Sequence, residues 1–318
     1  MFESPEQAHR ALAEVGYLTD RVTATAVYLA DKLHKPLLLE GPAGSGKTEL
    51  SYAVTRAAHT SIERLQCFEG LTSEHAIGKF DESLQRLYLE LATRSERPDW
   101  KALAKEITAL DFFIPGPLLK AILAKQRCVL LIDELDKVDH ALEATLLEIL
   151  SVWQISDPRL GTIPAESIPF TVLTSNEERR LGDPLRRRSL YLRIDYPTAE
   201  REGEIVARRT PEASPETHRL IAGVAKALRA YRLEKPPSVS EMIDIALAIE
   251  LLKIDEVTVE HRDALLPLFA KTARDRKKLA DLKDAFATIL YAAKLYAIEM
   301  ETRDVAEVLQ GAAEGAAA

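Results

Sequence analysis

Eight consecutive residues combine closely spaced glycines with a lysine and a hydroxyl side chain. In order they are Gly41, Pro42, Ala43, Gly44, Ser45, Gly46, Lys47 and Thr48. Because a glycine has no Cβ, backbone N–H groups can converge there on an anion. The lysine adds a positive charge, and the threonine hydroxyl lies where Mg²⁺ is held beside a phosphate. The pattern predicts a phosphate-binding loop for a nucleoside triphosphate, with ATP and Mg²⁺ as the expected ligands.

The segments on either side of this loop support the prediction. An apolar run at 36–39 precedes it, and a helix-compatible stretch at 49–58 follows it. The order strand, glycine-rich turn, helix separates a phosphate-binding loop from an ordinary glycine-rich turn. The N-terminus of the following helix contributes a partial positive charge toward the phosphates.

Two acidic residues come directly after the next strongly apolar run, at 129–132. Ligands of open α/β sheets bind at the carboxyl ends of strands, so this position suits a nucleotide site. We expect Asp133 to hold the Mg²⁺ shell opposite Thr48, and Glu134 to act as the base that polarises the attacking water. The neighbouring Asp136 and Lys137 are expected to start or cap the next helix.

Further along the chain, an amide and three arginines complete a candidate hydrolytic site. Asn176 follows an apolar run at 170–174, and its amide can bond the γ-phosphate or the attacking water. Arginines fill 186–188, where a solvated charged face is the ordinary interpretation. The alternative is an arginine that reaches a neighbouring subunit's γ-phosphate, with Arg188 the first choice and Arg187 the second.

The elements that position these residues follow from the hydrophobic pattern. Apolar runs predict strands at 36–39, 62–68, 129–134, 170–174 and 190–194. Helical spacing covers 5–35, and there Tyr17 and Leu18 are candidates for packing beside adenine, with core packing equally compatible.

The remaining segments do not follow the pattern of short apolar strands. The stretch 70–125 has helical spacing, a turn at 95–99, and an apolar loop at 112–117 that either closes a small core or grips a partner. A hairpin is expected at 153–163. From residue 198 on only helical periods occur, which predicts a core domain at 1–197 and an all-α domain at 198–318.

Composition limits the class of protein. Of 318 residues, 47% are hydrophobic and the net charge is −8, which is typical of a soluble globular chain and argues against bulk electrostatic binding of nucleic acid. No apolar stretch is long enough to cross a bilayer, and the N-terminus is unlike a signal peptide. The only cysteines, Cys67 and Cys128, are expected to be buried reduced thiols. These features predict a cytoplasmic protein without a membrane partner.

The phosphate loop, the acidic pair, Asn176 and the arginine run, in this order, resemble an AAA+ ATPase. Within that superfamily the chain looks most like the MoxR family, in the branch of the CoxD-type ATPase associated with carbon monoxide dehydrogenase. The strings that carry the closer match are 36–44, 64–67, 69–71, 187–191 and 194–197.

The resemblance implies an α/β fold, a P-loop NTPase with a parallel sheet flanked by helices, followed by an all-α lid. It implies ATP hydrolysis in a ring, usually a homo-hexamer, with ATP at subunit interfaces and the arginine finger supplied by the neighbour. The insertion at 70–125 and the hairpin would face a protein client. Family members are chaperone-like, often act beside a von Willebrand factor A domain protein and help mature metalloenzymes; the CoxD type is tied to a molybdenum hydroxylase.

The sequence departs from the family pattern at one position, and two other functions are compatible with it. The family usually carries a lid arginine that senses the nucleotide, but the string at 237–241 has none, so Lys235 or Arg232 would have to substitute. A nucleic-acid motor or clamp-loader-like ATPase would need a basic groove and salt-dependent stimulation by DNA. A nucleotide-dependent scaffold with little turnover would leave the acidic pair without a use.

Overall fold

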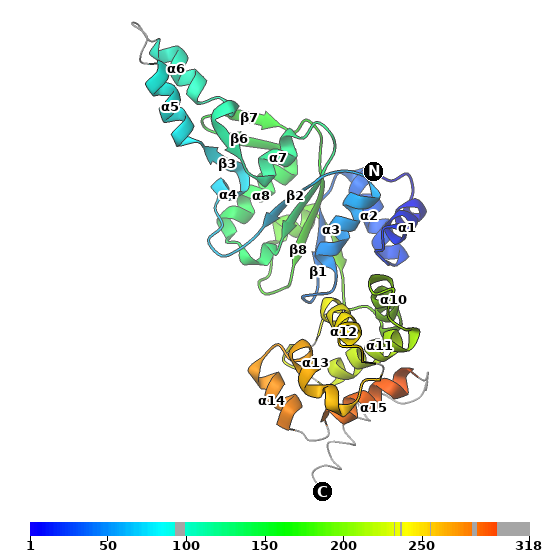
Figure 1. Cartoon of the computed structure of the whole chain (residues 1–318). Coiled ribbons are helices and arrows are strands. Elements are labelled where there is room, and N and C mark those ends of the chain that lie inside the picture. The colour runs from blue at the N-terminus through cyan, green and yellow to red at the C-terminus, as the bar shows by residue number, and fades with distance from the viewer. Residues whose placement is uncertain (93–98, 232, 236, 255, 282–284, 298–318) are drawn as a thin grey trace. The chain divides into compact units, whose positions relative to one another are not determined.

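The computed structural model describes residues 1–92, 99–231, 233–235, 237–254, 256–281 and 285–297 (Figure 1). These residues divide into two compact units. The first unit takes in Met1–Gly41 and Lys47–Ile194, and the second takes in Pro42–Gly46 and the described residues from Asp195 on.

The first unit is built around a sheet of five parallel strands in the order β2-β5-β8-β1-β9. The strands are β1 (Leu37–Glu40), β2 (Ile62–Gln66), β5 (Val129–Asp133), β8 (Phe170–Ser175) and β9 (Leu190–Arg193). All five lie where apolar runs predicted them, which confirms the parallel sheet. Because β8 lies between β5 and β1, the carboxyl ends of these three strands come together at one edge of the sheet.

Helices cover both faces of this sheet, as Figure 1 shows. The helices are α1 (Pro5–Glu14), α2 (Arg21–Leu33) and α3 (Lys47–Ala57) on one face, and α7 (Pro117–Leu123) and α8 (His140–Val152) on the other. Side chains of β5 alternate between the two cores: Leu131 packs toward α1–α3, whereas Leu130 and Ile132 pack toward α7 and α8. A run that is apolar at every position is therefore needed for this strand.

Polar side chains fix where several of these helices begin. The side chains of Ser4, Asp20 and Asp139 each accept a hydrogen bond from a backbone N–H in the first turn of the helix that follows. Such caps satisfy amides that have no partner inside the helix. Asp139, rather than Asp136 or Lys137, is thus the residue that caps α8.

The stretch between β2 and β5 carries an insertion of short elements before α7. They are α4 (Ser73–Ile77), β3 (Gly78–Phe80), α5 (Glu82–Ala92), α6 (Trp100–Ile107), the 3₁₀ turn η1 (Leu110–Phe112) and β4 (Phe113–Pro115). In Figure 1, α5 and α6 lie side by side beyond the antiparallel pair of β3 and β4. Tyr88 Oη donates to Glu106 Oε2 at 2.6 Å, which ties the two helices together. The turn predicted at 95–99 falls largely on 93–98, outside the described residues.

The apolar loop expected at 112–117 is partly structural. Phe113 is buried and packs edge-on against Phe80, with ring centroids 5.0 Å apart. Of the two readings offered by the sequence, closure of a small core therefore holds for Phe113, while Ile114 beside it is exposed. The predicted hairpin is confirmed as β6 (Gln154–Asp157) and β7 (Gly161–Pro164), and Arg159 at its turn stacks on the Phe80 ring.

The regular elements in the described part of the second unit are helices. Its helices are α10 (Ala199–Arg209), α11 (Pro215–Ala230), α12 (Val239–Leu251), α13 (Arg262–Phe269), α14 (Ala273–Asp281) and α15 (Ala285–Ala297). They share one hydrophobic core, which is separate from the two cores of the sheet. The described regular elements after residue 197 are helices, as the helical periods there predicted, whereas a domain boundary at 197 stays a prediction.

No helix in the described ranges has the length and apolar character that crossing a bilayer requires. Both cysteines are free and buried, as predicted. Burial, reinforced by nearby carboxylates, raises the pKa of the Cys67 thiol to about 12.

Candidate nucleotide-binding site

The glycine-rich loop runs from the end of β1 to the start of α3. Its backbone geometry explains why glycine is needed at particular positions. Gly41 has φ +151°, and a Cβ on it would lie 2.0 Å from the carbonyl oxygen of Ile194. Gly46 has φ +94°, in the region that side chains disfavour. Residues with a Cβ would therefore distort the loop at both ends, which accounts for glycine there.

Lys47, the first residue of α3, is buried at the base of the loop. Its Nζ donates to the carbonyl oxygen of Gly41 at 2.8 Å. Burial lowers the pKa of Lys47, and the negative charges of Asp136 and Asp133 work in the opposite direction. A triphosphate would add negative charge beside the ammonium and so favour its charged form.

Thr48 and Asp133 meet although 85 positions separate them in the sequence. Thr48 Oγ1 donates to Asp133 Oδ1 at 2.9 Å, and Thr174 Oγ1 of β8 donates to the same oxygen at 2.6 Å. Asp133 itself is 3% exposed. A hydroxyl and a carboxylate oxygen in contact are ligands that suit Mg²⁺, which takes one or two protein groups together with phosphate oxygens.

Two further observations fit a magnesium nucleotide at this position. Ser45 Oγ in the loop is buried without a hydrogen-bond partner among the described residues, so an acceptor such as a phosphate oxygen would satisfy it. Within the described ranges no group of three or more His, Cys, Asp or Glu side chains could hold a metal alone.

Glu134 has an unusual backbone conformation directly after β5. Its φ of +58° lies in the left-handed region, and its backbone N–H donates to Thr174 Oγ1 at 2.9 Å. Its carboxylate accepts a hydrogen bond from Lys137 Nζ at 2.5 Å, which raises the pKa of Lys137. Non-glycine residues in this region concentrate at functional sites. The ion pair with Lys137 involves Oε2 of the Glu134 carboxylate.

Asn176 follows β8, whose last residue, Ser175, is in register with Glu40 of β1. Asn176 therefore follows β8 at the same position along the sheet at which the phosphate loop follows β1. Asp136 Oδ2 accepts the backbone N–H groups of Asn176 and Glu178, both at 3.0 Å. The expectation that Asp136 and Lys137 start or cap the next helix is wrong, because Asp136 instead fixes the loop that carries Asn176 and Lys137 pairs with Glu134.

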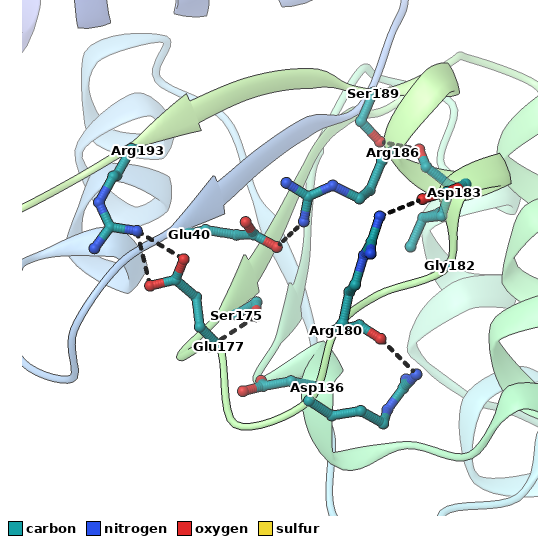
Figure 2. Close-up of polar contacts among 12 residues, drawn as sticks. Glu40, Asp136, Ser175, Glu177, Arg180, Gly182, Asp183, Arg186, Ser189 and Arg193 are labelled. Carbon is teal, nitrogen blue, oxygen red and sulfur yellow. Dashed lines mark hydrogen bonds and ion pairs between the residues drawn. The ribbon is translucent and has the colours of Figure 1, made fainter.

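The three arginines lie in α9 (Asp183–Arg188) and differ in their surroundings. Figure 2 shows Arg186 Nη1 bonded to Glu40 Oε1, at 2.6 Å, and its guanidinium also stacks on Tyr191. Arg187 and Arg188 are exposed and make no ion pair within the part of the chain that the structure describes.

The structure also brings in residues that sequence reasoning missed. Arg64 of β2 donates to the second oxygen of Asp133 at 2.6 Å, and Thr174 bridges Asp133 and Glu134. The one sequence signal for Thr174 is a hydroxyl side chain near the carboxyl end of β8, a strand that also contains Thr171 and Ser175. Nothing local marks Arg64, because charged residues on an edge strand are common.

The adenine contacts predicted for Tyr17 and Leu18 stay a prediction. Both side chains are half-buried, and Tyr17 packs against the core beneath α1–α3. Arg232, one of two residues considered for a lid cation, lies outside the described residues; Lys235 lies within them, and its backbone N–H donates to Asp275.

Residues 36–189 match the family model of the AAA domain, dynein-related subfamily. This part of the chain is therefore similar to an AAA domain. The matched stretch takes in the phosphate loop, Asp133, Glu134, Asn176 and all three arginines, so every residue predicted to act on the phosphates falls within it.

The relatives that match this chain are distant. An uncharacterized protein of Staphylococcus aureus (strain bovine RF122 / ET3-1) is 27% identical over 170 residues, which are 52% of this chain and 57% of that protein. The chain thus spans little more than half the length of that relative. An uncharacterized protein of Staphylococcus haemolyticus (strain JCSC1435) is 23% identical over 234 residues, 70% of this chain and 81% of its own.

Among solved structures, a mutant of RuvB from Thermotoga maritima is 17% identical, with a TM-score of 0.44 over 98% of this chain and 83% of that chain. The Thermotoga maritima RuvB Holliday junction branch migration motor is 16% identical, with a TM-score of 0.42 over 98% of this chain and 82% of its own.

Proposed function

We propose that this chain is an ATPase of the MoxR type, which hydrolyses ATP to ADP and phosphate at the site around Lys47. The contact between Thr48 and Asp133 carries the proposal, because it joins the phosphate loop to the acidic strand end. The AAA domain match over the same residues supports nucleotide chemistry at this site.

The residues divide the chemistry among them. Lys47 and the loop amides would hold the phosphates, and Thr48 and Asp133 would hold Mg²⁺, which neutralises charge on the phosphate oxygens when bound. Glu134 would take a proton from water as the water oxygen bonds to the γ-phosphorus and the bond to the β–γ bridging oxygen breaks. Asn176 would orient that water or the γ-phosphate through its amide.

The ring and its client belong to the same proposal. Arg188, or Arg187 as second choice, would reach the γ-phosphate of a neighbouring subunit in a homo-hexamer, and both side chains are exposed as this role requires. The client would be a protein that the ring remodels or matures. The CoxD resemblance points to a molybdenum hydroxylase such as carbon monoxide dehydrogenase, with a von Willebrand factor A domain protein as partner in the cytoplasm.

Two substitutions in the full chain test the nucleotide chemistry. Lys47→Ala should weaken ATP–magnesium binding roughly 10- to 100-fold, since it removes a charge-assisted hydrogen bond. Glu134→Gln should bind ATP normally but lose about 10²- to 10⁴-fold in turnover, since it removes the general base. Calorimetry measures the first effect and steady-state phosphate release the second.

The matched control is Lys35→Ala, which removes an exposed lysine of the same unit and should change neither quantity. Unmodified turnover in Glu134→Gln would show that another group is the base. Absence of any heat of ATP–magnesium binding with the folded wild-type chain would refute the proposal as a whole.

A further inference from the structure

Arg64 occupies the side of Asp133 that faces away from Thr48. Its Nη2 donates to Asp133 Oδ2 at 2.6 Å and also to Gln66 Oε1. Gln66 is directly in register with Asp133, and Arg64 lies two residues earlier on the same face of β2. Both oxygens of the expected metal-site carboxylate therefore have donors: two threonine hydroxyls on Oδ1 and one guanidinium on Oδ2.

The two partners differ in how readily they can separate. The Asp133 side chain is 4% exposed, whereas that of Arg64 is 44% exposed. Arg64 also interacts with Tyr52 and Gln66, and it would leave both if it turned into water. Because β2 is the edge strand of the sheet, the guanidinium lies at the border of the sheet rather than within it. Asp133 stays fixed by Thr48 and Thr174, so any separation moves Arg64.

A divalent cation held at Oδ1 and the guanidinium at Oδ2 would share one carboxylate. Both are cations and repel each other at such a separation. The negative charges of the triphosphate offset part of this repulsion, and the remainder acts between the metal and the guanidinium on their shared carboxylate. The guanidinium of Arg64, 2.6 Å from Oδ2, offsets the negative charge of Asp133.

We propose that Arg64 is a displaceable counter-cation, which neutralises Asp133 in the nucleotide-free site, leaves for solvent as magnesium nucleotide binds, and thereby sets the Mg²⁺ requirement. The inference rests on the proposed ATPase function and concerns the regulation of the same site. Arg64 would not contact the nucleotide; it would affect Mg²⁺ binding only through Asp133.

The test compares charge-removing and charge-keeping variants of the full chain. Arg64→Gln removes the charge but keeps a donor for Asp133, whereas Arg64→Lys keeps the charge. Arg56→Gln is the matched control, because Arg56 forms an exposed ion pair with Glu49 on α3 of the same unit. Binding of a non-hydrolysable ATP analogue is titrated at a series of free Mg²⁺ concentrations, and thermal unfolding is followed with and without magnesium analogue.

For Arg64→Gln, we expect the half-saturating Mg²⁺ concentration to fall about three- to fivefold, since one competing charge is gone. Arg64→Lys and Arg56→Gln should stay near wild type. Nucleotide-free Arg64→Gln should melt below wild type, and the difference should shrink when magnesium analogue is bound, because wild type has then also lost the ion pair.

The opposite results separate the two claims. If wild type binds the analogue in a magnesium-dependent way and the Mg²⁺ requirement of Arg64→Gln is unchanged or higher, Arg64 only positions Asp133, and the counter-cation inference is overturned while the ATPase proposal stands. If wild type shows no magnesium-dependent binding, both fall together.

Discussion

Of the three adjacent arginines, Arg186 is the one whose charge is used within its own chain. Its pairing with the buried Glu40 anchors α9 to the end of β1, one residue before the phosphate loop (Figure 2). The neighbouring Arg187 and Arg188 are exposed on the same short helix. Because Arg186 is already paired with Glu40, Arg187 and Arg188 are the two candidates for the proposed arginine finger. Arg188 is the first candidate.

Arg188→Ala should retain ATP binding and lose about 10³- to 10⁵-fold in turnover, the usual contribution of an arginine finger. If the finger acts on a neighbouring subunit, mixing Arg188→Ala with Lys47→Ala chains should restore part of the activity. Lys47→Ala subunits still present an arginine, while Arg188→Ala subunits still bind ATP. Phosphate release measured across mixing ratios checks this, and no recovery at any ratio would argue against action in trans.

At the scale of elements, the short pair of β3 and β4 connects the helical insertion to the sheet domain. Phe113 of β4 packs inward on Phe80, while Ile114 beside it points outward and is 50% exposed. Successive side chains of a strand point to opposite faces, so one of these two neighbours is buried and the other is exposed. The apolar side chains of this segment therefore contribute partly to a local core and partly to the surface.

Phe113→Ala should destabilise the chain by about 3–5 kcal/mol, the usual cost of deleting a buried aromatic ring. Ile114→Ala on the same strand is the matched control and should cost no more than about 0.5 kcal/mol. Chemical denaturation followed by circular dichroism measures both. Similar unfolding curves for the two variants would mean that Phe113 does not contribute to a core.

At the scale of the whole molecule, the proposed ring depends on surfaces that one chain alone does not reveal. The exposed Arg187 and Arg188 belong to the sheet-containing unit, and the described remainder of the chain is a separate helical unit. A nucleotide that binds the assembled ring more tightly than the single chain shifts the population toward the ring. We therefore expect assembly to depend on ATP.

The Glu134→Gln chain should hold ATP and turn it over very slowly, so with ATP and Mg²⁺ we expect it to sediment as a hexamer. Lys47→Ala should stay smaller at an ATP concentration that saturates Glu134→Gln but not Lys47→Ala, because it binds the nucleotide more weakly. Analytical ultracentrifugation over a range of protein concentrations distinguishes the two. A Glu134→Gln chain that stays monomeric with ATP at every concentration would refute the ring while leaving the binding site intact.

The sequence alone predicted the five strands, the helical second half and the phosphate loop. Each of these is specified by neighbouring residues: an apolar run for a buried strand, a period of 3.6 for a helix, and glycines that permit positive φ for the loop. Asp133 and Glu134 could be found the same way, because they directly follow a recognisable strand.

Only the tertiary structure decided which side chains meet. The order of strands in a parallel sheet is set by packing of the whole sheet against its helices, and no local pattern encodes it. That order places Arg64 and Thr174 on Asp133, and Asp136 under the loop of Asn176, where the sequence had suggested a helix cap. The residues proposed to carry the chemistry can thus be predicted from the chain itself, whereas the partners that hold them are set by which strands lie side by side.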